Sequence, residues 1–139
     1  MEVDGIIAKV ASLTVQERLN LARNTYADLM AKLSERYGDE EAVKLFITFV
    51  KVFVSADKVT TDAEYALFKL ITECNWSFSD FYEMTNGGSD PELVDAVDRF
   101  IDSLDEDSKI ASVVMAMSFM TIDGEITESE RRTLQKFYE

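Results

Sequence analysis

The stretch that decides the fold is residues 39–56, DEEAVKLFITFVKVFVSA. Three acidic residues open it, at the helix end where the backbone dipole favours negative charge. Apolar residues then fill nearly every position, which predicts a helix buried on almost all sides near the centre of the molecule. The β-branched and aromatic residues would also suit a strand, but the charged start favours a helix.

Helical spacing continues on the N-terminal side of this stretch. Thr14 and Glu17 form a capping-box pattern that predicts a helix start, and Gly38 suits the left-handed position that often ends a helix. Between them, apolar residues recur every three or four positions, as expected for one helical stripe. They are Leu19, Ala22, Tyr26, Leu29, Met30, Leu33 and Tyr37.

Helix starts also recur on the C-terminal side. Further helices are predicted after Thr61, from Ser77 to about Thr85, from Pro91, after Asp105 and from Thr127. The first dozen residues add at most one short helix. The chain has one proline and five glycines, and this scarcity of helix breakers agrees with an all-α fold. We therefore predict one domain over residues 1–139, a bundle of about six to eight helices.

Composition excludes several classes of function. Lys and Arg number 14 against 27 Asp and Glu, a net charge of −13, so a nucleic-acid surface is not expected. The chain contains no histidine, which excludes histidine-based acid–base catalysis and His-ligated zinc within it. A single cysteine, Cys74, lies on an apolar stripe, where a buried and inert thiol is expected. We expect no enzymatic activity.

The sequence gives no signal for secretion or membrane insertion. The first residues, MEVDGIIAKVASL, lack the cationic start and long apolar core of a signal peptide. The most apolar stretch, residues 45–54, is about half the length that a membrane-spanning helix needs. A cytoplasmic location is therefore expected.

Two loops share one plan. Residues 53–64 read FVSADKVTTDAE, and residues 119–130 read FMTIDGEITESE. Each follows an apolar helix and precedes an amphipathic one, which indicates an internal pseudo-twofold repeat with halves at approximately 39–75 and 105–139. The positions that match are Phe53 with Phe119, Asp57 with Asp123, Thr61 with Thr127, and Glu64 with Glu130.

With this motif the chain resembles the tellurite-resistance TerB family, in which an apolar helix is followed by Ala-Asp-Gly-x-Ile/Val and a helix with an acidic start. Residues 119–130 match the motif closely, and residues 54–64 match it with Lys58 in place of glycine. The resemblance covers residues 15–139. It implies a compact helical bundle, a bacterial cytoplasmic setting, and a link to metal ions or stress-response complexes, without an established reaction.

The acidic residues of the two loops have two interpretations. The first is helix capping alone, because Thr61 with Glu64 and Thr127 with Glu130 are both capping boxes. The second is a metal site formed by Asp57, Glu64, Asp123 and Glu130 if the loops lie side by side. Four carboxylates would then favour a hard divalent cation such as Ca²⁺, Mg²⁺ or Mn²⁺. A regular EF-hand is excluded because Phe119 would occupy its first ligand position.

The leading hypothesis is a non-enzymatic TerB-like stress-response or interaction module, whose paired acidic loops are a candidate site for a divalent cation. The competing one is a scaffold whose acidic face binds a basic protein partner without metal; a homodimer is also compatible with the sequence. An aromatic group follows the third predicted helix, and most of it should fill the bundle. Exposure of Trp76 or Tyr82 beside an apolar patch would favour a partner surface.

Overall fold

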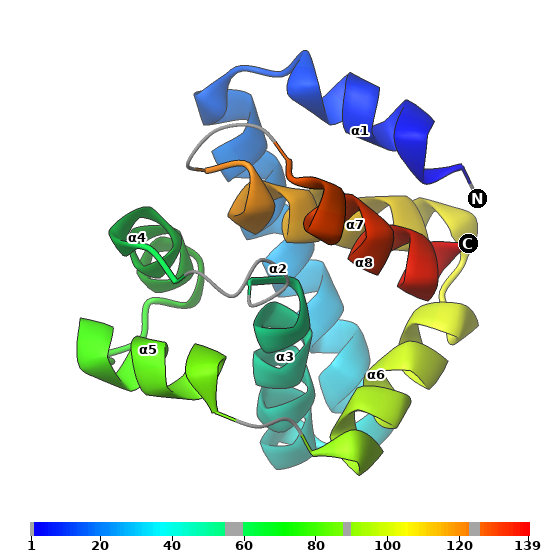
Figure 1. The fold of residues 1–139 in the computed structure, drawn as a ribbon. Helices are drawn as coiled ribbons and strands as arrows, with labels where there is room; N and C mark the ends of the chain where they lie inside the picture. Colours follow the sequence, from blue (N-terminus) through cyan, green and yellow to red (C-terminus); the bar gives the residue numbers. More distant parts are fainter. Residues whose placement is uncertain (1, 55–59, 88–89, 123–125) are drawn as a thin grey trace.

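The structure, a computed structural model, describes residues 2–54, 60–87, 90–122 and 126–139 (Figure 1). These residues form eight helices and no strand, so the prediction of an all-α bundle is confirmed. The helices are α1 (Val3–Ala11), α2 (Val15–Tyr37), α3 (Asp39–Val54), α4 (Asp62–Thr72), α5 (Phe78–Asn86), α6 (Pro91–Ser103), α7 (Glu106–Met120) and α8 (Glu128–Tyr138).

The helix starts lie where the capping signals predict them. Side chains of Thr14, Thr61, Ser77 and Thr127 each accept a hydrogen bond from the third residue of the helix that follows. The end of α2 differs from the prediction. Gly38 has φ 86° and ψ 160°, so it is not left-handed helical, although its positive φ still favours glycine. This conformation turns the chain directly into α3, where Ala42 N–H donates to the Gly38 carbonyl.

The most completely enclosed helix is α7, not α3. Every residue from 112 to 120 is buried, and α7 contacts α1, α2, α3, α4 and α8. The prediction that α3 is buried on almost all sides is wrong, because Val43 is 50% exposed and Lys44 is also exposed. These residues are exposed because none of the described helices packs over that face of α3.

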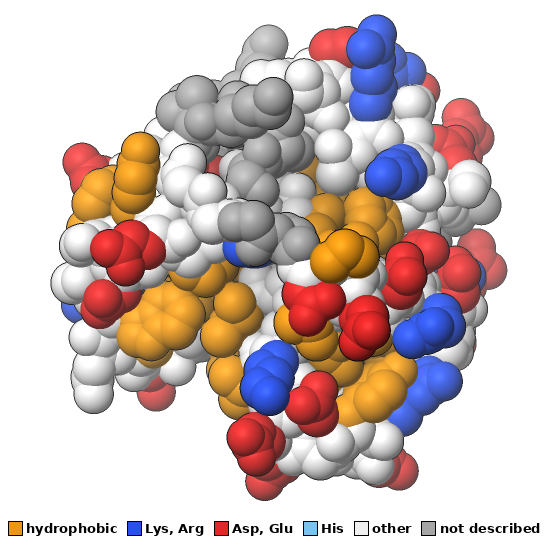
Figure 2. Space-filling model, turned by 60° about the horizontal axis from the view of Figure 1, so that its bottom comes forward, with side chains coloured by type: hydrophobic (Ala, Val, Ile, Leu, Met, Phe, Trp, Pro, Cys, Tyr) orange, Lys and Arg blue, Asp and Glu red, His pale blue; other side chains and the backbone are white. Residues whose placement is uncertain are grey.

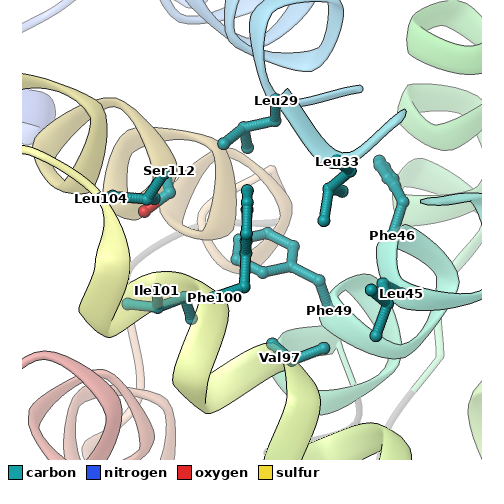
Figure 3. Close-up of a pocket in the computed structure, with 10 residues that line it drawn as sticks. All are labelled: Leu29, Leu33, Leu45, Phe46, Phe49, Val97, Phe100, Ile101, Leu104 and Ser112. Atoms are coloured by element: carbon teal, nitrogen blue, oxygen red, sulfur yellow. The ribbon is translucent and has the colours of Figure 1, made fainter. Parts of the chain in front are cut away.

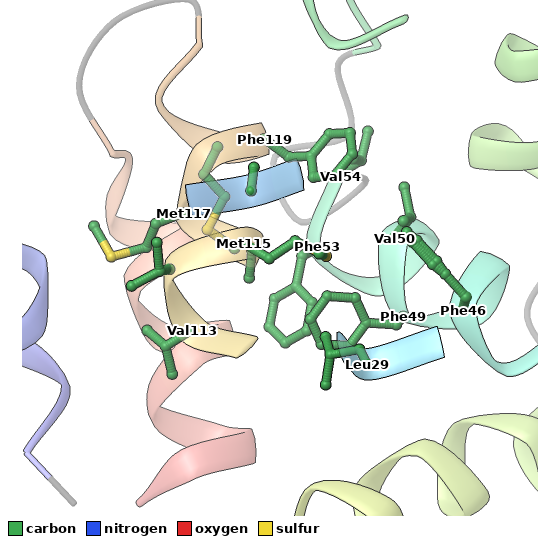
Figure 4. Packing of buried hydrophobic residues seen from close by; sticks show 14 of the residues in the cluster. Leu29, Phe46, Phe49, Val50, Phe53, Val54, Val113, Met115, Met117 and Phe119 are labelled. Carbon is green, nitrogen blue, oxygen red and sulfur yellow. The ribbon is translucent and has the colours of Figure 1, made fainter. Parts of the chain in front are cut away.

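A single apolar core joins the helices (Figure 4). Phe53 of α3 is fully buried, with its ring centroid 5.6 Å from that of Phe137 in α8. Met115 and Met117 of α7 are 0% and 1% exposed, so both pack in the core.

Two parts of the chain lie at the edges of this core. Helices α4 and α5 contact each other and lie together on the left of Figure 1, and α1 lies across α7 and α8. An ion pair fastens α1, because Arg131 Nε and Nη2 donate to the Asp4 carboxylate at 2.8 and 2.9 Å. None of the described helices is both long and apolar enough to cross a membrane.

Candidate functional site

The structure describes two of the four predicted metal ligands. Glu64 lies in the first turn of α4, and Glu130 lies in the first turn of α8. Asp57 and Asp123 lie outside the described residues. Within the described ranges, no three Asp, Glu, Cys or His side chains form a group that could hold a metal ion.

Both glutamates take part in capping boxes with matching geometry. Glu64 Oε1 accepts from Thr61 N–H at 2.8 Å, and Glu64 N–H donates to Thr61 Oγ1 at 3.2 Å. The corresponding distances between Glu130 and Thr127 are also 2.8 and 3.2 Å. Both predicted capping boxes are therefore present, and the two loops end in the same local structure.

Burial distinguishes these two boxes from the others in the described chain. Glu64 and Glu130 are each 2% exposed and are the two buried charged residues among those described. Glu17 and Asp80 occupy the same position in the boxes of α2 and α5, and both are exposed. Capping alone does not require burial, since a carboxylate at a helix start can remain in water.

The helices that carry the two loops contact each other reciprocally. The first loop leaves α3 and leads to α4, and the second leaves α7 and leads to α8. Helix α3 contacts α7, while α4 contacts α7 and α8 contacts α3. In Figure 4 the Phe119 side chain points towards Val54, the last residue of α3. Phe53 and Phe119, the matched aromatic residues, are 0% and 1% exposed.

A small apolar cavity between α2, α3 and α6 is too small to be a ligand site (Figure 3). Its volume is about 20 Å³, close to the size of one water molecule. Its lining is hydrophobic except for Ser112, whose Oγ lies 2.6 Å from the Tyr138 hydroxyl and donates to the Lys109 carbonyl. The cavity is therefore a packing gap in the core.

A larger pocket of about 170 Å³ opens between α2, α3 and α4. Its lining includes Tyr26, Phe46, Phe68 and Trp76, and Cys74 also lines it. Cys74 is half-buried rather than buried, which corrects the expectation of a buried thiol. The sequence did not reveal this pocket, because its residues come from three helical stripes that each predict ordinary core packing.

The aromatic group after α4 divides between core and surface. Phe81 is fully buried, Trp76 is half-buried beside the pocket, and Tyr82 is 49% exposed. Of these three residues, only Phe81 fills the bundle as expected. Trp76 and Tyr82 both reach solvent.

Comparisons with models of protein families, with curated proteins and with solved structures found no match for this chain.

Proposed function

We propose that this chain is a non-enzymatic, TerB-like interaction module of the bacterial cytoplasm, and that its two acidic loops bind one hard divalent cation. The ligands are Asp57, Glu64, Asp123 and Glu130. The observation that supports the proposal is the burial of Glu64 and Glu130, each 2% exposed, in capping boxes with the same geometry. The reciprocal contacts of α3, α4, α7 and α8 agree with a pseudo-twofold arrangement of the loops.

Metal binding is proposed because burial of a negative charge costs free energy. An ionised carboxylate removed from water is destabilised unless hydrogen bonds and opposite charge compensate for it. A divalent cation between the loops would stabilise both glutamates together with the loop aspartates. Because the chain contains no histidine, the ligands are oxygen atoms, which favours Ca²⁺, Mg²⁺ or Mn²⁺.

Metal-dependent melting tests this proposal. The melting temperature is measured after treatment with EDTA and again with millimolar Ca²⁺, Mg²⁺ or Mn²⁺, against NaCl of equal ionic strength. A cation at a hundred times its Kd would add about 2.7 kcal/mol to the free energy of unfolding, and the melting temperature should rise by several degrees.

Two variants make the test specific to the loops. Asp123→Asn should remove the metal-dependent rise, whereas Asp107→Asn, an exposed acid in the first turn of α7, should retain it. If the wild-type chain melts at the same temperature with metal and with NaCl, the metal site does not exist.

A scaffold that binds a basic partner without metal is the second candidate. It is favoured by the exposed acids Asp39, Glu40 and Glu41 at the start of α3, together with the net charge of −13. In that case binding of a lysine-rich peptide should persist in EDTA and should weaken when Glu40 and Glu41 are both replaced by glutamine. Binding that is lost on removal of metal would contradict this candidate.

A further inference from the structure

The pocket between α2, α3 and α4 has an aromatic lining that continues across three elements. The ring centroids of Tyr26 and Phe46 are 4.8 Å apart, those of Phe46 and Phe68 are 6.5 Å apart, and those of Phe68 and Trp76 are 5.4 Å apart. Phe46 and Phe68 are 6% and 3% exposed and form the floor, whereas Tyr26 and Trp76 are half-buried at the sides. The four rings therefore form one connected surface that reaches solvent.

The segment after α4 completes this pocket. Thr72 Oγ1 accepts from Cys74 N–H at 3.3 Å, and the Tyr65 hydroxyl donates to the Trp76 carbonyl at 2.6 Å. These bonds hold the segment that carries Cys74 and Trp76 against the end of α4. The main chain at Trp76 is therefore held by a hydrogen bond within the protein, and the indole packs against Phe68.

An acidic residue adjoins this pocket in the sequence. None of the described residues that line it carries a formal charge, and Glu73 lies between two of them in sequence, Thr72 and Cys74. Burial raises the pKa of the Tyr26 hydroxyl, and the negative charge of the Glu73 carboxylate raises it further.

Glu73 also has an unusual backbone conformation. It ends α4 with φ 56° and ψ 29°, the left-handed conformation that glycine adopts most readily. It is the one described non-glycine residue with positive φ. A glutamate at this position puts an acidic residue between Thr72 and Cys74 of the pocket lining, despite the preference for glycine.

We propose that this pocket binds an organic ammonium cation, a quaternary or methylated ammonium head group. The π faces of aromatic rings attract cations, and alkylated ammonium groups combine positive charge with an apolar surface that suits such a lining. The carboxylate of Glu73 and the net charge of −13 favour a cation over an anion of similar size. The pocket volume of about 170 Å³ is sufficient for a group of this kind.

This inference is independent of the metal proposal, since it uses none of the residues of the two acidic loops. Figure 2 shows one face of the molecule, on which acidic, basic and hydrophobic side chains are interspersed. A free small molecule and a methylated lysine side chain of a partner share this head group.

Trp76 provides a direct readout because it is the only tryptophan in the chain. Its fluorescence is titrated with tetramethylammonium chloride, with NaCl as the ionic control and 3,3-dimethyl-1-butanol as the neutral counterpart of choline. A saturable change with tetramethylammonium and with choline is expected, and the neutral alcohol should bind about tenfold more weakly. A peptide containing trimethyllysine, compared with the unmethylated peptide, distinguishes a partner side chain from a free ligand.

Charge variants at Val43 separate cation binding from simple apolar binding. Val43 lines the pocket, is 50% exposed and lies within α3, where both lysine and glutamate are compatible with a helix. Val43→Lys should weaken tetramethylammonium binding several-fold and Val43→Glu should strengthen it, whereas Val15→Lys, at an exposed residue of α2 outside this pocket, should have no effect.

Glu73→Gln should also weaken binding several-fold without changing far-UV circular dichroism. The proposal is overturned if neither tetramethylammonium nor the trimethyllysine peptide gives a saturable response. It is equally overturned if the neutral alcohol binds as well as choline, or if the two Val43 variants change the affinity in the same direction.

Discussion

Truncation of the buried glutamates tests whether burial adds to capping. In Glu64→Ala, the Thr61 N–H loses its acceptor at 2.8 Å and the Thr61 hydroxyl loses a contact at 3.2 Å. A hydrogen bond to a charged group contributes about 1.5–3 kcal/mol, and each buried methylene group adds about 0.8 kcal/mol. We therefore expect Glu64→Ala and Glu130→Ala each to lower the free energy of unfolding by about 2–4 kcal/mol.

Glu17→Ala is the matched control for this experiment. Glu17 Oε1 accepts from Thr14 N–H at 2.9 Å, so the capping bond is the same as in the other two boxes, but the side chain is exposed. Its loss should therefore cost clearly less than the loss of Glu64 or Glu130. Glu64→Gln keeps the shape and an acceptor oxygen, and it should lie between wild type and Glu64→Ala.

Urea unfolding followed by circular dichroism at 222 nm measures these differences. The samples are kept at pH 7 in EDTA, so that a bound cation does not contribute, and the m-values are compared to verify two-state behaviour. If Glu17→Ala lowers the free energy of unfolding as much as Glu64→Ala, the reasoning from burial is wrong and the boxes act only as helix caps.

Three further predictions concern contacts between distant parts of the chain. Ser112→Ala removes the partner that lies 2.6 Å from the buried Tyr138 hydroxyl, and chemical unfolding should show a loss of about 1–3 kcal/mol, most of it absent when Tyr138→Phe is already present. Burial raises the pKa of Tyr138 above its usual value near 10, so the unfolded chain loses the hydroxyl proton at a lower pH than the folded chain. The free energy of unfolding should therefore fall as the pH rises above 10, and this fall should be smaller in Tyr138→Phe. The Arg131 guanidinium lowers the pKa of Asp4, so this ion pair should be retained above pH 3.8 and lost as the pH falls through the lowered pKa. Hydrogen exchange should show the α1 amides opening at that low pH, and in Asp4→Asn they should open already at pH 7.

Local sequence signals predicted the helices well. Capping residues such as Thr14 and Thr127 bind backbone groups only three positions away, so a short stretch of sequence contains the whole interaction. The prediction for Gly38 was less accurate, because the requirement for positive φ is local but ψ depends on how α2 turns into α3. Helix positions were therefore more predictable than the connections between them.

Burial was predicted less well than helix position. The sequence of residues 39–56 is more apolar than most of the chain, yet α3 exposes Val43, while α7 encloses Ser112 and Ser118. The serine side chains of α7 bond to carbonyl groups of the preceding turn, which lets a polar residue occupy the core. An apolar stripe shows that a helix has a buried face, but not how many faces its neighbours cover.

The candidate sites show the same contrast between local geometry, which the sequence predicts, and burial, which it does not. The repeated loop motif identified Glu64 and Glu130 from the sequence, together with their capping geometry, because both depend on residues close in the chain. Their burial could not be predicted, since Glu17 has the same local pattern and remains exposed. It results from packing among α3, α4, α7 and α8, which lie far apart in sequence.

The sequence by itself thus determined an acidic, helical chain, the starts of its helices and a repeated loop, because spacing and capping act within a few residues. Only the tertiary structure decided that Glu64 and Glu130 are buried and that Tyr26, Phe46, Phe68 and Trp76 meet around one pocket. Those features depend on which helix faces come together, and that choice is made by the packing of the whole chain.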